Sequence, residues 1–206
     1  MSGYEYVARD ERMHIKRFVI QSLNFTQNCV KEKYTYRYHF VGNEPRCIIT
    51  RNLAKGIGDQ YDIQIVVNDD EEYFTAKGIC NIFLSAFSLF CPKYDIIICT
   101  DNEYIIKATI KNKRVDNLLL TVNIALTKEI KGKTFILKYK DDLYYWEEKE
   151  LISNEIMIKE KWCKELNYWN ELRESFLLER NKEENFDVES RVLYEKVLND
   201  LYKTKG

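Results

Sequence analysis

The chain has 206 residues, of which 45% are hydrophobic and 32% are charged; this mixture excludes a disordered chain and can form a core. Only 7 Gly and 2 Pro are present, which excludes collagen-like and low-complexity proteins. The apolar runs are far shorter than the ~20 residues of a membrane span, so we expect no membrane partner.

Charge is unevenly distributed along the chain. Residues 1–140 carry 21 Lys/Arg and 16 Asp/Glu, a net charge of +5, whereas residues 141–206 carry 11 and 17, a net charge of −6. The asymmetry predicts two units, an α+β domain over 1–140 and a helical module over 141–206. The basic first unit permits a polyanionic ligand.

The compartment is predicted from what the chain lacks. Residues 1–14 contain no apolar stretch of the kind found in secretion signals. The six cysteines form no CxxC pair and the chain has only two histidines, so a zinc site is not expected. We therefore predict buried thiols in a reducing cytoplasm.

The first half of the chain predicts helix, strand, loop and strand. An amphipathic helix is predicted over 8–28, with an apolar stripe through Met13, Lys16, Ile20 and Leu23. Residues 34–41 and 61–67 alternate with period two and predict strands, the first with one aromatic face. Between them, 42–60 predicts an irregular loop, with a short strand at Cys47–Thr50.

The second half predicts a helix, a β-meander and more helices. Acidic residues at 68–72 suggest a turn and a helix start, and 72–90 has a wide apolar helical face. Four strand-like segments follow, over 94–100, 103–111, 118–127 and 133–140.

From residue 150 the spacing of apolar residues changes from the period of two that is typical of strands to the period of 3.6 that is typical of helices. One face, or two collinear helices, is predicted to carry Ile158, Trp162, Leu166, Trp169, Leu172 and Phe176. A last helix is predicted over 186–202, with inward positions at Val188, Val192, Leu193, Val197, Leu198 and Leu201.

Polar residues stand at matching phases of two predicted strands. Asp62 and Gln64 point to one face by the period-two rule, and Asn123 lies on the polar face of its own strand. A glycine turn, Gly42-Asn43, ends the strand before them. If the strands are neighbours in a sheet, we expect the three side chains to meet near the loop 43–58.

This layout resembles the nucleotidyltransferase-fold superfamily over residues 34–127. The family motif is a strand, Gly-Ser, a loop, Asp-x-Asp or Asp-x-Glu, and a third acidic residue on a later strand. The resemblance implies a mixed, mostly antiparallel sheet with helices on one face, followed by a helical module. The chain also looks like small uncharacterised proteins of bacterial mobile elements.

The resemblance implies a catalytic site at Asp62, Gln64 and Asn123. In the family, three carboxylates hold two Mg²⁺ ions that position a nucleoside triphosphate. Here only Gly42 and Asp62 match the motif, because Asn43, Gln64 and Asn123 replace the serine and two acids. Asp62 remains as the metal ligand, and weak Mg²⁺ binding is all that we expect.

Basic residues of the loop are candidates for nucleotide binding. Arg46, Arg51 and Lys55, with Gly42 and Asn43, are placed to contact phosphates, and they are equally explained as solvated charges. A competing alignment places the glycine turn at Lys55-Gly56-Ile57-Gly58. The aromatic strand with Arg37 and His39 would suit stacked RNA, but no ribonucleoprotein signature accompanies it, so packing in the core is favoured.

Three functions remain open. The first is a catalytically degenerate member of the fold that binds a nucleotide, RNA or a protein, and this is the one we favour. The second is an active Mg²⁺-dependent nucleotidyltransferase. The third is a mobile-element inhibitor of host defence that binds RNA or protein.

Overall fold

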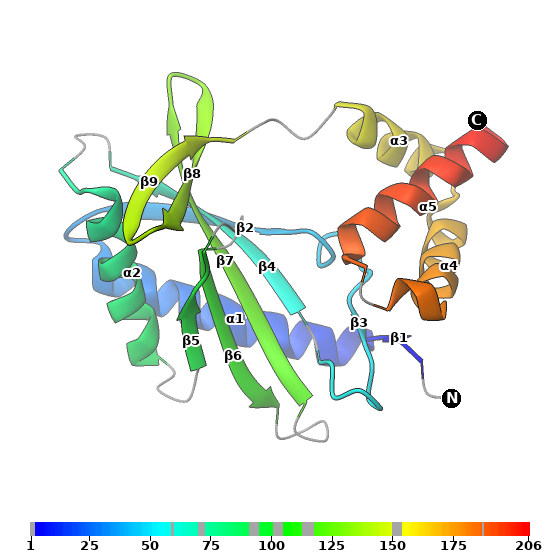
Figure 1. Ribbon diagram of the computed structural model, residues 1–206, viewed down its shortest axis with the longest axis horizontal. Coiled ribbons are helices and arrows are strands. Elements are labelled where there is room, and N and C mark those ends of the chain that lie inside the picture. The colour runs from blue at the N-terminus through cyan, green and yellow to red at the C-terminus, as the bar shows by residue number, and fades with distance from the viewer. Residues whose placement is uncertain are drawn as a thin grey trace.

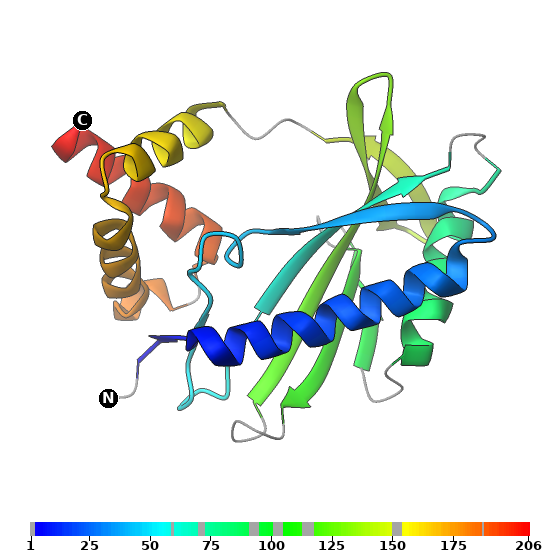
Figure 2. The same cartoon turned by 180° about the vertical axis from the view of Figure 1, so that it is seen from behind.

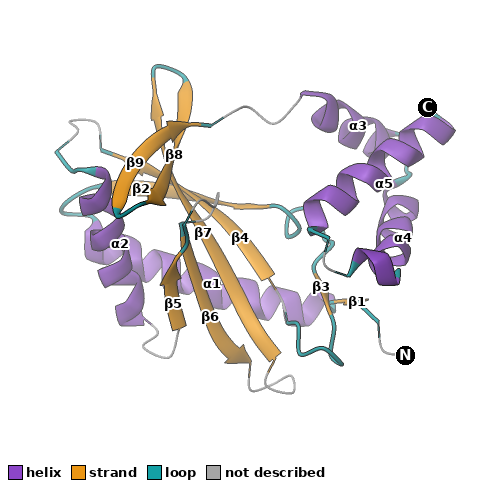
Figure 3. Ribbon diagram, viewed as in Figure 1, coloured by secondary structure: helices purple, strands orange, loops and turns teal. Residues whose placement is uncertain are grey.

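A mixed β-sheet with helices on one face forms the larger part of the molecule (Figures 1 and 3). The computed structural model describes residues 3–58, 60–69, 73–90, 95–100, 105–112, 118–149, 154–186 and 188–206. The strands of the sheet are β2 (Thr35–Val41), β4 (Gln60–Asn68), β5 (Asp95–Ile98), β6 (Ile106–Asn112), β7 (Leu118–Ile130), β8 (Lys133–Lys140) and β9 (Leu143–Glu148). The α+β class is as predicted.

The strand order places the two site-bearing strands side by side. It runs β2-β4-β7-β6-β5, and β8 pairs with the later part of β7 and with β9. Strands β4 and β7 pair in parallel, and the other pairs of this sheet are antiparallel. The predicted meander is therefore confirmed from β5 to β8, and β9 extends it beyond the predicted strands.

Two helices, α1 (Arg9–Val30) and α2 (Ala76–Phe90), cover one face of the sheet (Figure 2). The aromatic side of β2 faces them, as predicted. The Tyr36 ring lies 5.7 Å from the ring of Phe83, and the Tyr36 hydroxyl donates to the carbonyl of Leu23. Alternate residues of β4, namely Tyr61, Ile63 and Ile65, are fully buried on the same side. The other residues of β4 therefore face away from the helices.

The buried face of α1 matches the predicted stripe only in part: Leu23 is fully buried and Ile20 is partly buried, but the first half of the stripe is displaced. Met13 is 39% exposed and Lys16 forms an ion pair with Glu44, whereas Ile15 and Val19 lie in the core. The helix buries Ile15, Val19, Ser22, Leu23, Thr26 and Val30. Small polar Ser22 and Thr26 are tolerated there because their hydroxyls donate to backbone carbonyls of the helix itself.

The start of α2 also differs from the prediction. The helix begins at Ala76 and has no acidic residue in its first turn. The Asp69 carboxylate instead accepts hydrogen bonds from the backbone N–H groups of Tyr73 and Phe74, in the turn before the helix. Residues 70–72 lie outside the described part of the chain.

The C-terminal helices α3 (Asn154–Glu165), α4 (Trp169–Arg180) and α5 (Ser190–Lys205) pack around a second apolar cluster. The expected collinear geometry is wrong, because α3 and α4 run in different directions and meet at Asn167, whose φ is +61°. The predicted packing residues Trp162, Trp169, Leu172 and Phe176 nevertheless all lie in this cluster or pack against it. Ile158, Leu166 and Val192 are exposed. The cluster contains Ile48, Cys163, Leu172, Phe176, Leu193, Tyr194, Val197, Leu198 and Leu201. The division of the chain at residue 140 stays a prediction.

A short N-terminal strand joins the two parts. Strand β1 (Glu5–Tyr6) pairs with β3 (Thr50–Arg51), close to where a short strand was predicted. Beside it, Asn181 at the end of α4 accepts a hydrogen bond from the Tyr4 N–H and donates one to the Tyr4 carbonyl.

The thiols are not all buried. Cys80 and Cys163 are, but Cys29 is exposed, Cys47 and Cys99 are partly exposed, and Cys91 lies outside the described residues. Within the described part of the chain, every helix is too short or too polar to cross a bilayer.

Candidate functional site

The parallel pairing of β4 and β7 sets Asp62 directly beside Asn123. Both side chains project from the face of the sheet opposite α1 and α2, because Tyr61 and Ile63 on either side of Asp62 point into the core. Only 8% of Asp62 and 9% of Asn123 is exposed. A carboxylate buried to this degree needs partners close by.

Two amide side chains supply those partners. Asn123 Nδ2 donates to Asp62 Oδ1 at 2.8 Å, and Gln60 Nε2 donates to the same oxygen at 3.0 Å. Both contacts are charge-assisted hydrogen bonds, which are stronger than those between neutral groups. The negative charge of Asp62 is thus stabilised by amide donors of neighbouring residues.

Gly42 lies against the other oxygen of Asp62. Its predecessor Val41 pairs with Asp62 across β2 and β4, and Gly42 then turns away with a φ of +66°. A Cβ added at Gly42 would lie 2.7 Å from Asp62 Oδ2. Both the backbone conformation and the close approach therefore require glycine. The following residue, Asn43, accepts the Ile48 N–H through its backbone carbonyl.

Gln64 shares the face of Asp62 and Asn123 but is directed elsewhere. Its register partner on β7 is Ala125, and its Nε2 donates to Thr127 Oγ1 at 3.2 Å. Thr127 in turn donates to the carbonyl of Ile65. The structure thus brings Asp62 and Asn123 into contact, with Gly42 against them, and turns the amide of Gln64 along the sheet.

The basic residues of the loop bind protein groups. Arg51 forms ion pairs with Glu5 at 2.9 Å and Glu11 at 2.7 Å. Lys55 is exposed, with its ammonium 3.8 Å from the centre of the Phe186 ring.

Arg46 connects the glycine turn to the C-terminal helices. Its guanidinium donates to the Gly42 carbonyl at 2.9 Å and to Glu160 of α3 at 2.7 Å, and it lies over the ring of Tyr194 of α5. Burial, reinforced by Glu160, raises the pKa of Tyr194, so its hydroxyl stays neutral and donates to Glu160 at 3.0 Å. Arg46 therefore ties the Gly42 turn beside Asp62 to helices α3 and α5.

The donor set does not fit a pair of magnesium ions. Mg²⁺ prefers anionic oxygens in an octahedral arrangement, and Asp62 is the one carboxylate of the three motif positions. Asn123, at the position of the third acid of the resembled motif, directs its amide nitrogen toward that carboxylate. Within the described residues, no three His, Cys, Asp or Glu side chains are grouped to hold a metal.

Sequence reasoning did not single out Lys107. It pairs in register with Asn123 across β6 and β7, so it stands on the same face as Asp62. Its side chain is partly exposed. The alternation within 103–111 could have assigned Lys107 to the polar face of its strand. Its position beside Asn123, however, depends on which strands pair.

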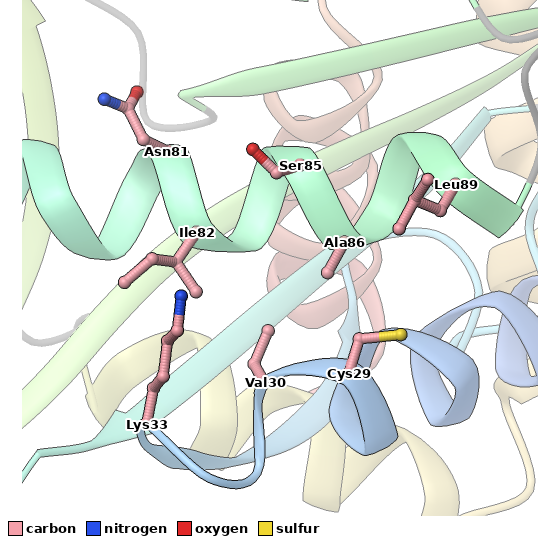
Figure 4. A pocket seen from close by; sticks show the side chains of 8 residues that line it. All are labelled: Cys29, Val30, Lys33, Asn81, Ile82, Ser85, Ala86 and Leu89. Atoms are coloured by element: carbon pink, nitrogen blue, oxygen red, sulfur yellow. The ribbon is translucent and has the colours of Figure 1, made fainter.

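A shallow pocket of 310 Å³ lies away from these residues, between α1 and α2 (Figure 4). Ile82 and Ala86 of α2 face Val30 and Cys29 of α1 across it, and the side chain of Lys33 extends toward Ile82. Because α1 and α2 cover the opposite face of the sheet, this pocket is separate from the Asp62 site.

Comparison with known proteins finds relatives by structure alone. No family model and no curated protein matches the sequence. A dinucleotide cyclase of Vibrio cholerae, DncV, in complex with GTP superimposes with a TM-score of 0.66 at 10% identity, over 95% of this chain and 69% of that chain. The CdnE c-di-GMP synthase of Capnocytophaga granulosa gives a TM-score of 0.61 at 13% identity, over 95% and 61%.

The chain has a nucleotidyltransferase fold. The sequence-based resemblance is confirmed at the level of architecture. A third structure, the 3'-deoxy GTP bound form of Vibrio cholerae DncV, agrees with a TM-score of 0.65 at 11% identity, over 95% of this chain and 67% of that chain. Among the solved structures that match with a TM-score of 0.57 or more, this chain spans 53% to 69% of the length of the other chain.

Proposed function

We propose that this protein binds a nucleotide on the polar face of its sheet and does not transfer it. The observation that carries the proposal is the hydrogen bond from Asn123 to Asp62, which occupies the carboxylate that the fold would use for metal ions. Structures of similar fold contain GTP, which supports a nucleotide as the ligand.

The loss of charge explains why transfer is not expected. Two magnesium ions beside a triphosphate require several anionic ligands, and an amide oxygen adds no net charge. With Gln64 and Asn123 in place of acids, Asp62 alone would have to hold them. Asp62, Gln64 and Asn123 are therefore proposed as the remnant of a catalytic site, with Gly42 and Asn43 as its turn.

A binding and turnover experiment tests the proposal. GTP, ATP, CTP and UTP are titrated calorimetrically with Mg²⁺ or Mn²⁺, and pyrophosphate release is followed in parallel. We expect binding of at least one nucleotide without pyrophosphate release. Release that Asp62→Asn abolishes would show an active, metal-dependent enzyme and overturn the proposal.

A double variant tests the assignment of positions. Gln64→Asp combined with Asn123→Asp restores the acidic pattern of the family, and it should strengthen nucleotide binding in Mg²⁺ but not in EDTA. If neither the wild type nor the double variant binds nucleotide, the proposal is refuted and the RNA- and protein-binding alternatives take its place. A role as a mobile-element inhibitor of host defence would then be tested first.

A further inference from the structure

We infer that the polar sheet face binds nucleotide phosphates without a divalent metal, and that Lys107 is the cation that receives them. This inference rests on the proposed nucleotide binding and specifies how it occurs.

The sheet register places Lys107 in one row with the remnant site. Reading across β4, β7 and β6, the row is Asp62, Asn123 and Lys107. Residues paired in this way project from the same face, and neighbouring strands are ~4.8 Å apart. The Cα atoms of Lys107 and Asp62, two strands apart, are therefore about 10 Å from each other. A polyphosphate can span this distance.

Lys107 differs from Arg46 and Arg51 in its ion pairing, and it differs from Lys55, whose ammonium lies over the Phe186 ring, in standing beside Asn123. Arg46 and Arg51 are engaged by Glu160, Glu5 and Glu11. Lys107 makes no ion pair with any residue that the structure describes, and it is partly open to solvent. An ammonium group in this setting can donate charge-assisted hydrogen bonds to phosphate oxygens.

Asp62 then has a role opposite to that of a metal ligand. With amide donors on its Oδ1 and no metal, its negative charge repels a polyphosphate that comes near it. The phosphates should therefore lie toward Lys107. Removing the charge of Asp62 distinguishes metal-dependent from metal-free binding. It should lower the nucleotide affinity of a metal-dependent site, and it should leave the affinity of a metal-free site equal or higher.

The experiment measures affinity for GTP and for inorganic tripolyphosphate in EDTA and in Mg²⁺. We expect similar affinity in both conditions. Lys107→Met should weaken binding at least about tenfold, as loss of a hydrogen bond to a charged group does. Lys107→Arg should retain most of it. The matched control is Lys77→Met, an exposed lysine on α2, which should leave affinity unchanged, and Asp62→Asn should not reduce affinity in EDTA.

Cys99 provides a second readout. Burial raises the pKa of its thiol and the charge of Lys107 opposes this. Phosphate bound at Lys107 should slow modification of Cys99 by a thiol reagent, followed by mass spectrometry, while the exposed Cys29 reacts unchanged.

The outcomes separate the inference from the proposed function. Binding that requires Mg²⁺ and disappears in Asp62→Asn would overturn metal-free binding, yet the protein would still be a nucleotide binder. Equal affinity of wild type and Lys107→Met in EDTA would also overturn it. No binding in either condition would refute the proposed function itself.

Discussion

Asn123 Nδ2 lies 2.8 Å from Asp62 Oδ1 and donates a hydrogen bond to it, so that an amide and a carboxylate on adjacent parallel strands are in direct contact. In an acidic pair at the same positions, the two charges would repel. With an acid at position 123, a cation would be needed to stabilise this part of the sheet. With Asn123, the amide itself stabilises Asp62.

The first prediction concerns Asn123→Asp. Two carboxylates in contact at neutral pH should lower the free energy of unfolding by about 1–3 kcal/mol. The loss should be reduced by Mg²⁺ or Mn²⁺, or at about pH 5, where the pair can share a proton. Thermal unfolding with EDTA and with metal measures this.

Asn28→Asp is the control for that prediction. It makes the same chemical change at an exposed position of α1, so it should be nearly neutral and unaffected by metal. A stable Asn123→Asp protein that ignores metal would contradict the geometry proposed for the site.

The second prediction compares two glycines. Gly42 and Gly56 both have a positive φ, +66° and +64°, but only Gly42 lies against another group, Asp62 Oδ2. Gly56→Ala should cost about 1 kcal/mol of stability through its backbone conformation alone. Gly42→Ala should cost more, because Asp62 must also shift.

Denaturant unfolding of both alanine variants measures the difference. Similar losses for the two would mean that the turn at Gly42 yields easily and does not position Asp62.

The third prediction concerns the ion pair between Arg46 and Glu160. Their side chains are 24% and 18% exposed, so removing one partner leaves a poorly solvated charge. Arg46→Met and Glu160→Gln should each destabilise the protein by about 1–3 kcal/mol, and the double variant by less than their sum.

The exposed pair Lys133 and Glu148, at 62% and 53%, serves as the comparison for that cycle. Its coupling should be below about 1 kcal/mol. If the Arg46 cycle gives no larger coupling than this pair, Arg46 does not fasten the glycine turn to α3.

The fourth prediction is a pH dependence at Glu179. Hydrogen bonds from Lys182 and Lys196 lower the pKa of this carboxyl from 4.5 to about 2. Because the pKa is lower in the folded state, its contribution is fully present above pH 4.5 and is lost as the pH falls toward 2.

Unfolding temperatures of wild type and Glu179→Gln should therefore differ at pH 7 and converge near pH 2. Glu174→Gln, an exposed glutamate on the same helix, should show no such convergence. A constant difference between wild type and Glu179→Gln across this range would remove the assigned cause.

Period-two alternation was sufficient to predict most of the sheet. It assigned the aromatic residues of β2 to the core, and it gave Asp62 and Asn123 the same face, which the register confirms. Alternation works here because one side of each strand must be buried. Strand β9 was not predicted, because its hairpin turn is Asp141-Asp142, both with positive φ, and lacks the glycine that usually marks such turns.

Contacts between distant segments could not be predicted in this way. The stripe of α1 shifted to Ile15 and Val19 because the helix packs on α2 and the sheet at once. The partners of Arg46 and Arg51 come from α3 and from residues before and within α1. Only the pairing of strands revealed that Lys107 stands beside Asn123.

The two hydrogen bonds between Tyr4 and Asn181 have a consequence for how the chain folds during synthesis. These hydrogen-bond partners are 177 positions apart in the sequence. At ribosomal rates of about 5–20 residues per second, Tyr4 emerges roughly 9–35 s before Asn181 exists. Throughout that interval β1 must wait without the helices that later fasten it. The sheet can assemble first, and closure of the N-terminal segment onto α4 is then among the last steps of synthesis-coupled folding.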